Sequence, residues 1–147
     1  MRRACGYAEH RIRMPPTILL AEDHEDNRIA LLTVLEHGGY RTLAACNGQE
    51  AVDLATEHLP DLVVMDLAMP VMNGKDAMRA LKADPRTAGI PIIVLTAMAL
   101  SIDRDKLEGE GFDGFLTKPC MPPYLLAEVR RFIGPAQPEA EAAVAGE

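Results

Sequence analysis

Three carboxylates stand directly after apolar runs of the chain, where strands would end. Glu22 and Asp23 follow the run 17–21, and Asp66 follows the run 62–65. Because the carboxyl ends of parallel strands meet at one edge of a sheet, these side chains become neighbours if the two strands pair. Such crowding needs a counter-charge, and Mg²⁺ binds carboxylate oxygens while leaving positions for a phosphate. Each carboxylate taken singly could equally open a loop or cap a helix, so the inference depends on all three.

A hydroxyl and an ammonium group are expected at the same edge. Thr96 ends one later apolar run, and Lys118 and Pro119 follow the next. Together these groups suit a phosphoryl group: Asp66 would be the in-line nucleophile that forms an aspartyl phosphate, Lys118 would neutralise phosphoryl oxygens, and Thr96 would donate a hydrogen bond. Taken alone, Thr96 is an ordinary strand residue and Lys118 a solvated lysine. The peptide bond before Pro119 can be cis, which would turn the lysine back over the sheet.

Five short apolar runs alternate with longer amphipathic stretches, a pattern typical of a parallel sheet with crossover helices. The predicted strands are 17–21, 41–45, 62–65, 92–95 and 114–117. The predicted helices are 26–37, 47–58, 75–83, 101–108 and 122–133. We therefore predict an α/β fold, a flavodoxin-like doubly wound five-stranded parallel sheet of order 2-1-3-4-5 with five helices. Local pattern alone leaves that strand order open.

Two helix boundaries carry explicit signals. Asn47 can cap the second predicted helix, and Glu50 lies three residues on, as in a capping box. Gly38 and Gly39 follow the first predicted helix, where a left-handed residue can close it. We expect one folded unit, 17–133, with a flexible extension at 1–16 and a disordered tail at 134–147. Only fourteen residues follow position 133, too few for an output domain.

The composition indicates where the protein acts and which kinds of partner it binds. The chain has 147 residues, 48% of them hydrophobic, which is enough for a single buried core. The formal net charge of −7 argues against nucleic acid and against a membrane surface as partners. No signal peptide or disulfide framework is indicated, since Cys5, Cys46 and Cys120 show no ligand spacing. We expect a cytoplasmic protein that binds other proteins.

With these residues in view, the chain resembles the response-regulator receiver domains of two-component signalling across nearly all of 17–133. The resemblance rests on four segments in order: ILLAED (18–23), DLAMPVMNG (66–74), LTA (95–97) and GFLTKP (114–119). Each segment is weak alone, and the four in order are a strong signal.

The resemblance implies a role for each matching position. Asp66 would be the phosphoacceptor and a metal ligand, Asp23 the other direct carboxylate ligand, and Glu22 a ligand through water. The backbone carbonyl of Ala68 would complete the protein's share of the Mg²⁺ shell, with Mn²⁺ as the alternative ion. Thr96 and Lys118 would contact the phosphoryl oxygens.

The resemblance also implies a switch: Thr96 moves toward the phosphoryl group and Phe115 turns inward behind it. Phe115 lacks the hydroxyl of the tyrosine often found there, so no hydrogen bond from this ring is available. Ala68 and Met98 carry no polar side chain that could orient an attacking water, which leaves the lifetime of the phosphorylated state open.

The implied partners are a sensor histidine kinase or a histidine phosphotransfer protein as donor. The downstream protein, reached through the surface of the fourth helix, fifth strand and fifth helix, stays unnamed. The protein would be a monomer or a weak homodimer. It would not be an enzyme beyond Mg²⁺-dependent self-phosphorylation and self-dephosphorylation, and it would act either as a relay intermediate or as a terminal switch.

Two alternatives stay open at this point. An Mg²⁺-dependent phosphatase or phosphotransferase can also form an aspartyl-phosphate intermediate, although Ala68 stands where a second carboxylate would serve as acid or base. A degenerate receiver would keep the fold but act without phosphorylation. The intact set of Asp23, Asp66, Thr96 and Lys118 argues against that reading.

Overall fold

The computed structural model describes residues 14–97 and 101–136. Within these ranges five strands alternate with five helices: β1 (Thr17–Ala21), α2 (Glu25–His37), β2 (Arg41–Ala45), α3 (Gly48–His58), β3 (Leu62–Asp66), α4 (Gly74–Ala83), β4 (Ile92–Thr96), α5 (Ser101–Glu110), β5 (Gly114–Thr117) and α6 (Pro122–Ile133). No helix of this described part is long and apolar enough to cross a membrane.

The strands form one parallel sheet in the order β2-β1-β3-β4-β5, which confirms the predicted fold and strand order. The pairing of β1 with β3 runs from Ile18 opposite Leu62 to Ala21 opposite Met65. The next position on each strand is a carboxylate, Glu22 on one and Asp66 on the other. This register is what brings the acidic residues to one edge.

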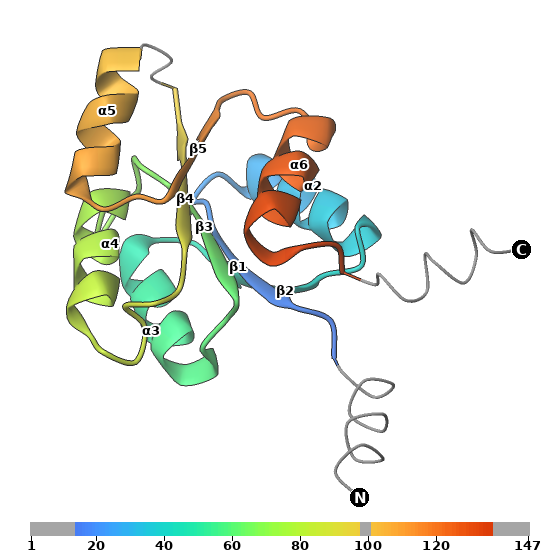
Figure 1. Cartoon of the computed structure of the whole chain (residues 1–147), viewed down its shortest axis with the longest axis horizontal. Coiled ribbons are helices and arrows are strands. Elements are labelled where there is room, and N and C mark those ends of the chain that lie inside the picture. The colour runs from blue at the N-terminus through green and yellow to red at the C-terminus, as the bar shows by residue number, and fades with distance from the viewer. Residues whose placement is uncertain (1–13, 98–100, 137–147) are drawn as a thin grey trace, which may run out of the picture.

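Helices cover both faces of the sheet (Figure 1). The helices α3, α4 and α5 lie on one side, and α2 and α6 lie on the other. Successive strand residues point to opposite faces, so neighbours such as Ile18 and Leu19 belong to different core clusters. The strands β3 and β4 are buried along their whole length, which explains why their sequences are continuously apolar up to the terminal polar residue.

The start of α3 confirms the predicted cap. Oδ1 of Asn47 accepts a hydrogen bond from the backbone N–H of Glu50 at 2.8 Å. Oε1 of Glu50 accepts from the backbone N–H of Cys46 at 2.7 Å, one residue earlier than a standard capping box. Two otherwise unpaired donors at this helix end are thus satisfied.

Several boundaries differ by one or two residues from the predicted ones. The strands β3 and β4 each include the polar residue after the apolar run, Asp66 and Thr96, because both still pair in the sheet. The helix α4 begins at Gly74 because Asn73 accepts from the backbone N–H of Asp76 and caps it. The helix α5 continues past 108 because Gly109 remains helical.

The predicted extensions fall mostly on residues 1–13 and 137–147, outside the described residues. The described start of the predicted tail is packed against the core. The hydroxyl of Tyr40 donates to the carbonyl of Gly134 at 2.7 Å, and Ala136 packs against the cluster under α2 and α6. The packed unit therefore continues slightly beyond the predicted boundary at 133.

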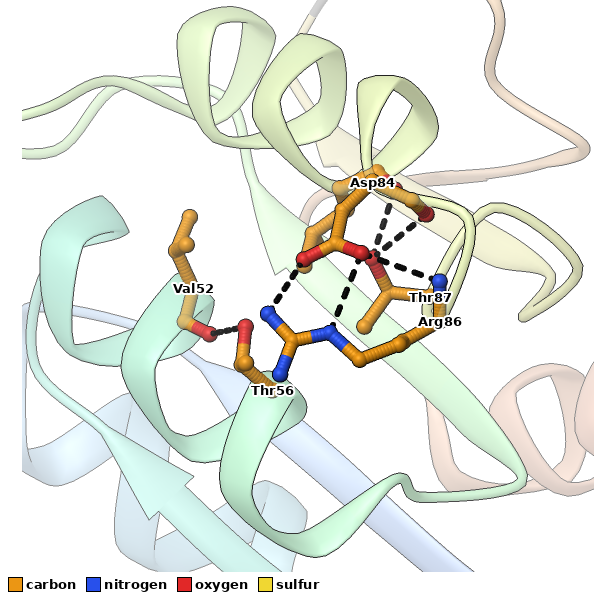
Figure 2. A network of polar contacts seen from close by, with 6 residues as sticks. Val52, Thr56, Asp84, Arg86 and Thr87 are labelled. Carbon is orange, nitrogen blue, oxygen red and sulfur yellow. Dashed lines mark hydrogen bonds and ion pairs between the residues drawn. The ribbon is translucent and has the colours of Figure 1, made fainter.

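The connection from α4 to β4 is closed by polar contacts (Figure 2). The side chain of Thr87 is fully buried, and its hydroxyl donates to the carbonyl of Leu81 at 2.6 Å. Asp84 accepts from the guanidinium of Arg86 at 2.8 Å, and this hydrogen bonding lowers the pKa of the Asp84 carboxyl. The second threonine in the figure, Thr56, donates to the carbonyl of Val52 on α3.

These two threonines give a matched test of the buried hydroxyl. Thr87→Val removes the donor to Leu81 in a buried loop, and we expect a loss of about 1–3 kcal/mol in the free energy of unfolding. Thr56→Val makes the same chemical change on a half-buried helix surface, where the bonded carbonyl belongs to the helix ladder, and should stay within about 0.5 kcal/mol of the parent. Urea unfolding measures both. Equal losses would show that the buried hydroxyl is not the cause.

Candidate functional site

The three carboxylates predicted to meet do meet at the carboxyl edge of the sheet. Glu22 and Asp23 follow β1, and Asp66 ends β3. Each offers one oxygen atom, and these atoms lie within 4.8 Å of one another. Glu22 and Asp66 are buried, whereas Asp23 is exposed. Negative charge is therefore concentrated at this point of the fold.

Lys118 supplies positive charge to the cluster from the end of β5. Its Nζ lies 2.9 Å from Oδ2 of Asp66, to which it donates a hydrogen bond, and 3.2 Å from Oε1 of Glu22. The peptide bond between Lys118 and Pro119 is cis. One ammonium group thus contacts carboxylates from two different strands.

The protonation of these groups reflects burial and mutual charge. Burial raises the pKa of the Glu22 carboxyl, the backbone N–H of His24 opposes this, and the charge of Asp66 adds to it. Burial also works to lower the pKa of Lys118, but its close contacts with Asp66 and Glu22 outweigh burial and raise it. Lys118 therefore stays cationic at neutral pH, while the ionised form of Glu22 is disfavoured.

A cleft of about 380 Å³ opens beside this cluster. Its lining includes the three carboxylates and Lys118, together with Ala68 from the loop after β3 and Thr96 from the end of β4. Thr96 is buried and pairs in the sheet with Thr117. The structure thus brings together every residue predicted for phosphoryl and metal contact.

Of the two predicted switch residues, Thr96 lines this cleft and Phe115 is not among its lining residues. Phe115 is on β5, half-buried, and packs against the core cluster under α3, α4 and α5. The guanidinium of Arg104, from α5, lies 5.3 Å from the centre of its ring, a cation–π distance. Met98, predicted to flank the phosphoryl site, lies outside the described residues.

The donor set fits a hard divalent cation. Oε1 of Glu22 is buried and, among the described residues, accepts no hydrogen bond even though Lys118 lies near. Lys118 brings a single positive charge to three clustered carboxylates, so a second cation would balance their charge. The available ligands are all oxygens, which Mg²⁺ prefers.

The loop between β3 and α4, which carries Ala68, is held at two glycines. The backbone N–H of Gly74 donates to the carbonyl of Leu67, and that of Gly48 donates to the carbonyl of Met72, both at 2.9 Å. A Cβ atom on Gly74 would overlap the carbonyl oxygen of Asp66. Close approach of backbone to backbone therefore fixes the end of β3 and the loop after it.

One residue at the site was missed by the sequence reasoning. Arg28, in α2, contacts the backbone carbonyls of Glu22 and Asp23. The available signal was an arginine five residues after Asp23, early in the first predicted helix.

The doubly wound sheet and the acidic, lysine-bearing edge define a flavodoxin-like α/β protein with an anion-accepting site. The family model for the response regulator receiver domain matches residues 18–130, and the chain belongs to this family. It is therefore a receiver domain, and this membership does not favour the alternative of a phosphatase or phosphotransferase acting on small molecules.

Named relatives agree with this assignment. The chain is 34% identical over 123 residues to the polar-differentiation response regulator DivK of Brucella anthropi, which covers 84% of this chain and all of DivK. Among solved structures, it resembles the receiver domain of a sensor histidine kinase from Pseudomonas aeruginosa, with a magnesium ion coordinated in the active-site cleft. That match has 34% identity and a TM-score of 0.75, and covers 82% of this chain and 98% of that one. A chemotaxis response regulator of Vibrio cholerae matches with 27% identity and a TM-score of 0.77, covering 81% and 99%.

Proposed function

We propose that Asp66 accepts a phosphoryl group from a phosphohistidine on a sensor histidine kinase or a histidine phosphotransfer protein. The P–N bond of the donor breaks, an O–P bond forms to a carboxylate oxygen of Asp66, and the departing imidazole takes up a proton. The observation that carries this proposal is the cluster of three carboxylate oxygens within 4.8 Å, with the ammonium of Lys118 beside it. Such a cluster is arranged for a ligand that brings both a cation and an anion.

The other site residues have separate tasks in this proposal. Lys118 already donates a hydrogen bond to Asp66, and its ammonium group stabilises the negative charge of the phosphoryl oxygens once they arrive. Thr96 lines the same cleft, and its hydroxyl donates to a phosphoryl oxygen. The contacts of Lys118 with Asp66 and Glu22 hold its ammonium group at the site before the donor arrives.

The carboxylates of Asp23 and Asp66 and the carbonyl of Ala68 would hold Mg²⁺, with Glu22 acting through water and Mn²⁺ as a substitute ion. When bound, the ion neutralises charge on the reacting oxygens. The grouping of three carboxylate oxygens within 4.8 Å of one another supports this assignment. The magnesium ion in the cleft of the similar Pseudomonas aeruginosa domain supports it as well.

The output would pass through the surface formed by α5, β5 and α6. Thr96 and Phe115 would change position on phosphorylation and bias that surface toward a protein partner. We propose that the protein acts in the cytoplasm as a monomer or weak homodimer, and that its own phosphorylation and dephosphorylation are the chemistry it carries out.

Incubation with acetyl phosphate as a small phosphodonor and Mg²⁺ tests the transfer. We expect one phosphoryl group per chain, detected by intact-protein mass spectrometry, and no incorporation when the metal is chelated. Multiple turnover on phosphorylated metabolites would contradict the proposal and favour an enzyme.

Metal binding is also expected to stabilise the fold. At a free Mg²⁺ concentration of about one hundred times the dissociation constant, the folded protein gains about 2.7 kcal/mol. Asp23→Asn removes a direct ligand and should largely abolish this gain. Glu57→Gln changes an exposed acid on α3, away from the cluster, and should keep it. Thermal unfolding with and without Mg²⁺ measures each gain, and an undiminished shift in Asp23→Asn would remove that residue from the ligand set.

A further inference from the structure

The loop that carries Glu22 and Asp23 is tied down by a side chain from the following helix. Arg28 is half-buried in α2, and its Nη1 donates to the carbonyl of Glu22 at 3.0 Å and to that of Asp23 at 3.4 Å. Its own backbone N–H donates to the carbonyl of His24 at 2.9 Å. Arg28 thus contacts three successive backbone carbonyls of the acidic loop.

Two further hydrogen bonds fix Glu22 but leave Asp23 aside. The backbone N–H of Glu22 donates to the carbonyl of Ala45 on β2 at 3.0 Å. Oε2 of Glu22 accepts from the backbone N–H of His24 at 3.1 Å. Within the described residues, the carbonyl of Asp23 accepts a hydrogen bond from the side chain of Arg28. Arg28 therefore holds the backbone at both Glu22 and Asp23.

Arginine suits this task better than lysine. Its planar guanidinium presents several donors in a fixed geometry and stays charged at all ordinary pH values. A lysine ammonium is a point charge on a flexible stem, so it holds two neighbouring carbonyls less firmly. In the described part of the chain Arg28 forms no ion pair with a carboxylate. The hydrogen bonds of its guanidinium go to backbone carbonyl oxygens instead.

We propose that Arg28 is a positioning residue for the metal site: it holds the backbone of Glu22 and Asp23 so that their carboxylates face Asp66. This inference rests on the proposed function for its metal-binding consequence. A positioning role and a purely electrostatic role predict changes of opposite sign in Mg²⁺ affinity when Arg28 is replaced. A guanidinium near a cation site repels the cation, so removing a charge that did nothing else would tighten Mg²⁺ binding. Removing a positioning contact weakens it, typically by tenfold or more.

Three variants of the full chain test the proposal by isothermal titration with Mg²⁺ at fixed ionic strength. Arg28→Gln removes the charge and the guanidinium fork, and Arg28→Lys keeps the charge but not the fork. Both should weaken Mg²⁺ binding, by about tenfold. Arg41→Gln makes the same change in net charge at an exposed position at the start of β2 and should bind as the parent does. Titration well below the unfolding temperature keeps a general loss of stability from altering the result.

Hydrogen exchange of the metal-free protein gives a second readout. The backbone amides of residues 23–25 should exchange faster in Arg28→Gln and Arg28→Lys, with no change in the strands. Tighter Mg²⁺ binding in Arg28→Gln, or parental binding in Arg28→Lys, would overturn the proposal. If the parent itself bound no Mg²⁺, the metal part of the proposed function would fail. Exchange at 23–25 would then decide whether Arg28 orders the loop, and parental exchange there would overturn that role too.

Discussion

Asp66→Asn is expected to take up no phosphoryl group from a small phosphodonor, whereas the parent takes up one. An amide cannot form the acyl phosphate that a carboxylate forms, so the expected effect is complete loss of labelling. Asparagine has nearly the shape of aspartate, and the substitution removes one of the mutually repelling carboxylates, so the fold should persist. Intact-protein mass spectrometry measures labelling, and circular dichroism verifies folding.

A matched control separates the acceptor from other acids. Asp53→Asn makes the same chemical change at an exposed position on α3 and should label like the parent. The label on the parent should also be released by hydroxylamine, as expected of an acyl phosphate. Labelling that persists in Asp66→Asn would show that another group is the acceptor, and the other two carboxylates of the cluster, Glu22 and Asp23, would be the first candidates.

Gly74→Ala should strongly destabilise the fold beside the site. The added Cβ would overlap the carbonyl oxygen of Asp66, and backbone cannot move aside as a flexible side chain can. We expect a loss of about 3 kcal/mol in the free energy of unfolding, at the upper end for overpacking. We also expect slower phosphorylation, because relief of the overlap shifts the end of β3. Urea unfolding and labelling rates measure the two effects.

Gly109→Ala provides the comparison for this glycine. It lies in α5, and among the described residues no atom outside its own stretch of helix comes within 4 Å of the added Cβ. Alanine favours a helix over glycine by about 1 kcal/mol, so this variant should be slightly more stable than the parent. If Gly74→Ala lowered the free energy of unfolding by less than about 1 kcal/mol, the loop would be able to relax, and close packing at this glycine would not be required.

Much of the fold could be predicted because each buried strand leaves a clear pattern. The strands β3 and β4 are covered on both faces, so their sequences are apolar until the edge, where Asp66 and Thr96 appear. The helix ends were harder to place. Gly74 and Gly109 suggest breaks, yet the cap at Asn73 lets α4 begin at the first, and α5 continues through the second. A local cap thus explains the helical start at Gly74, and a single glycine such as Gly109 costs a helix only about 1 kcal/mol, which is too little to end it.

The membership of the site was easier to predict than its internal contacts. Parallel strand ends meet at one edge whatever their side chains, so the grouping of Glu22, Asp66 and Lys118 follows from topology. That Lys118 reaches Glu22 as well as Asp66 depends on rotamers, which a sequence does not display. The bonds from Arg28 were also hidden, because their acceptors are backbone carbonyls that every residue possesses.

The placement of Lys118 also bears on the order in which the chain folds. The two buried carboxylates come from β1 and β3, whereas the ammonium that compensates them follows β5, an edge strand paired with β4 alone. A nascent chain that has emerged only through β3 carries both acids without that cation, and their repulsion opposes close pairing of β1 with β3. Docking of the last strand removes the repulsion. We therefore expect the addition of β5 to favour close pairing of β1 with β3, because it brings Lys118 to their carboxylates.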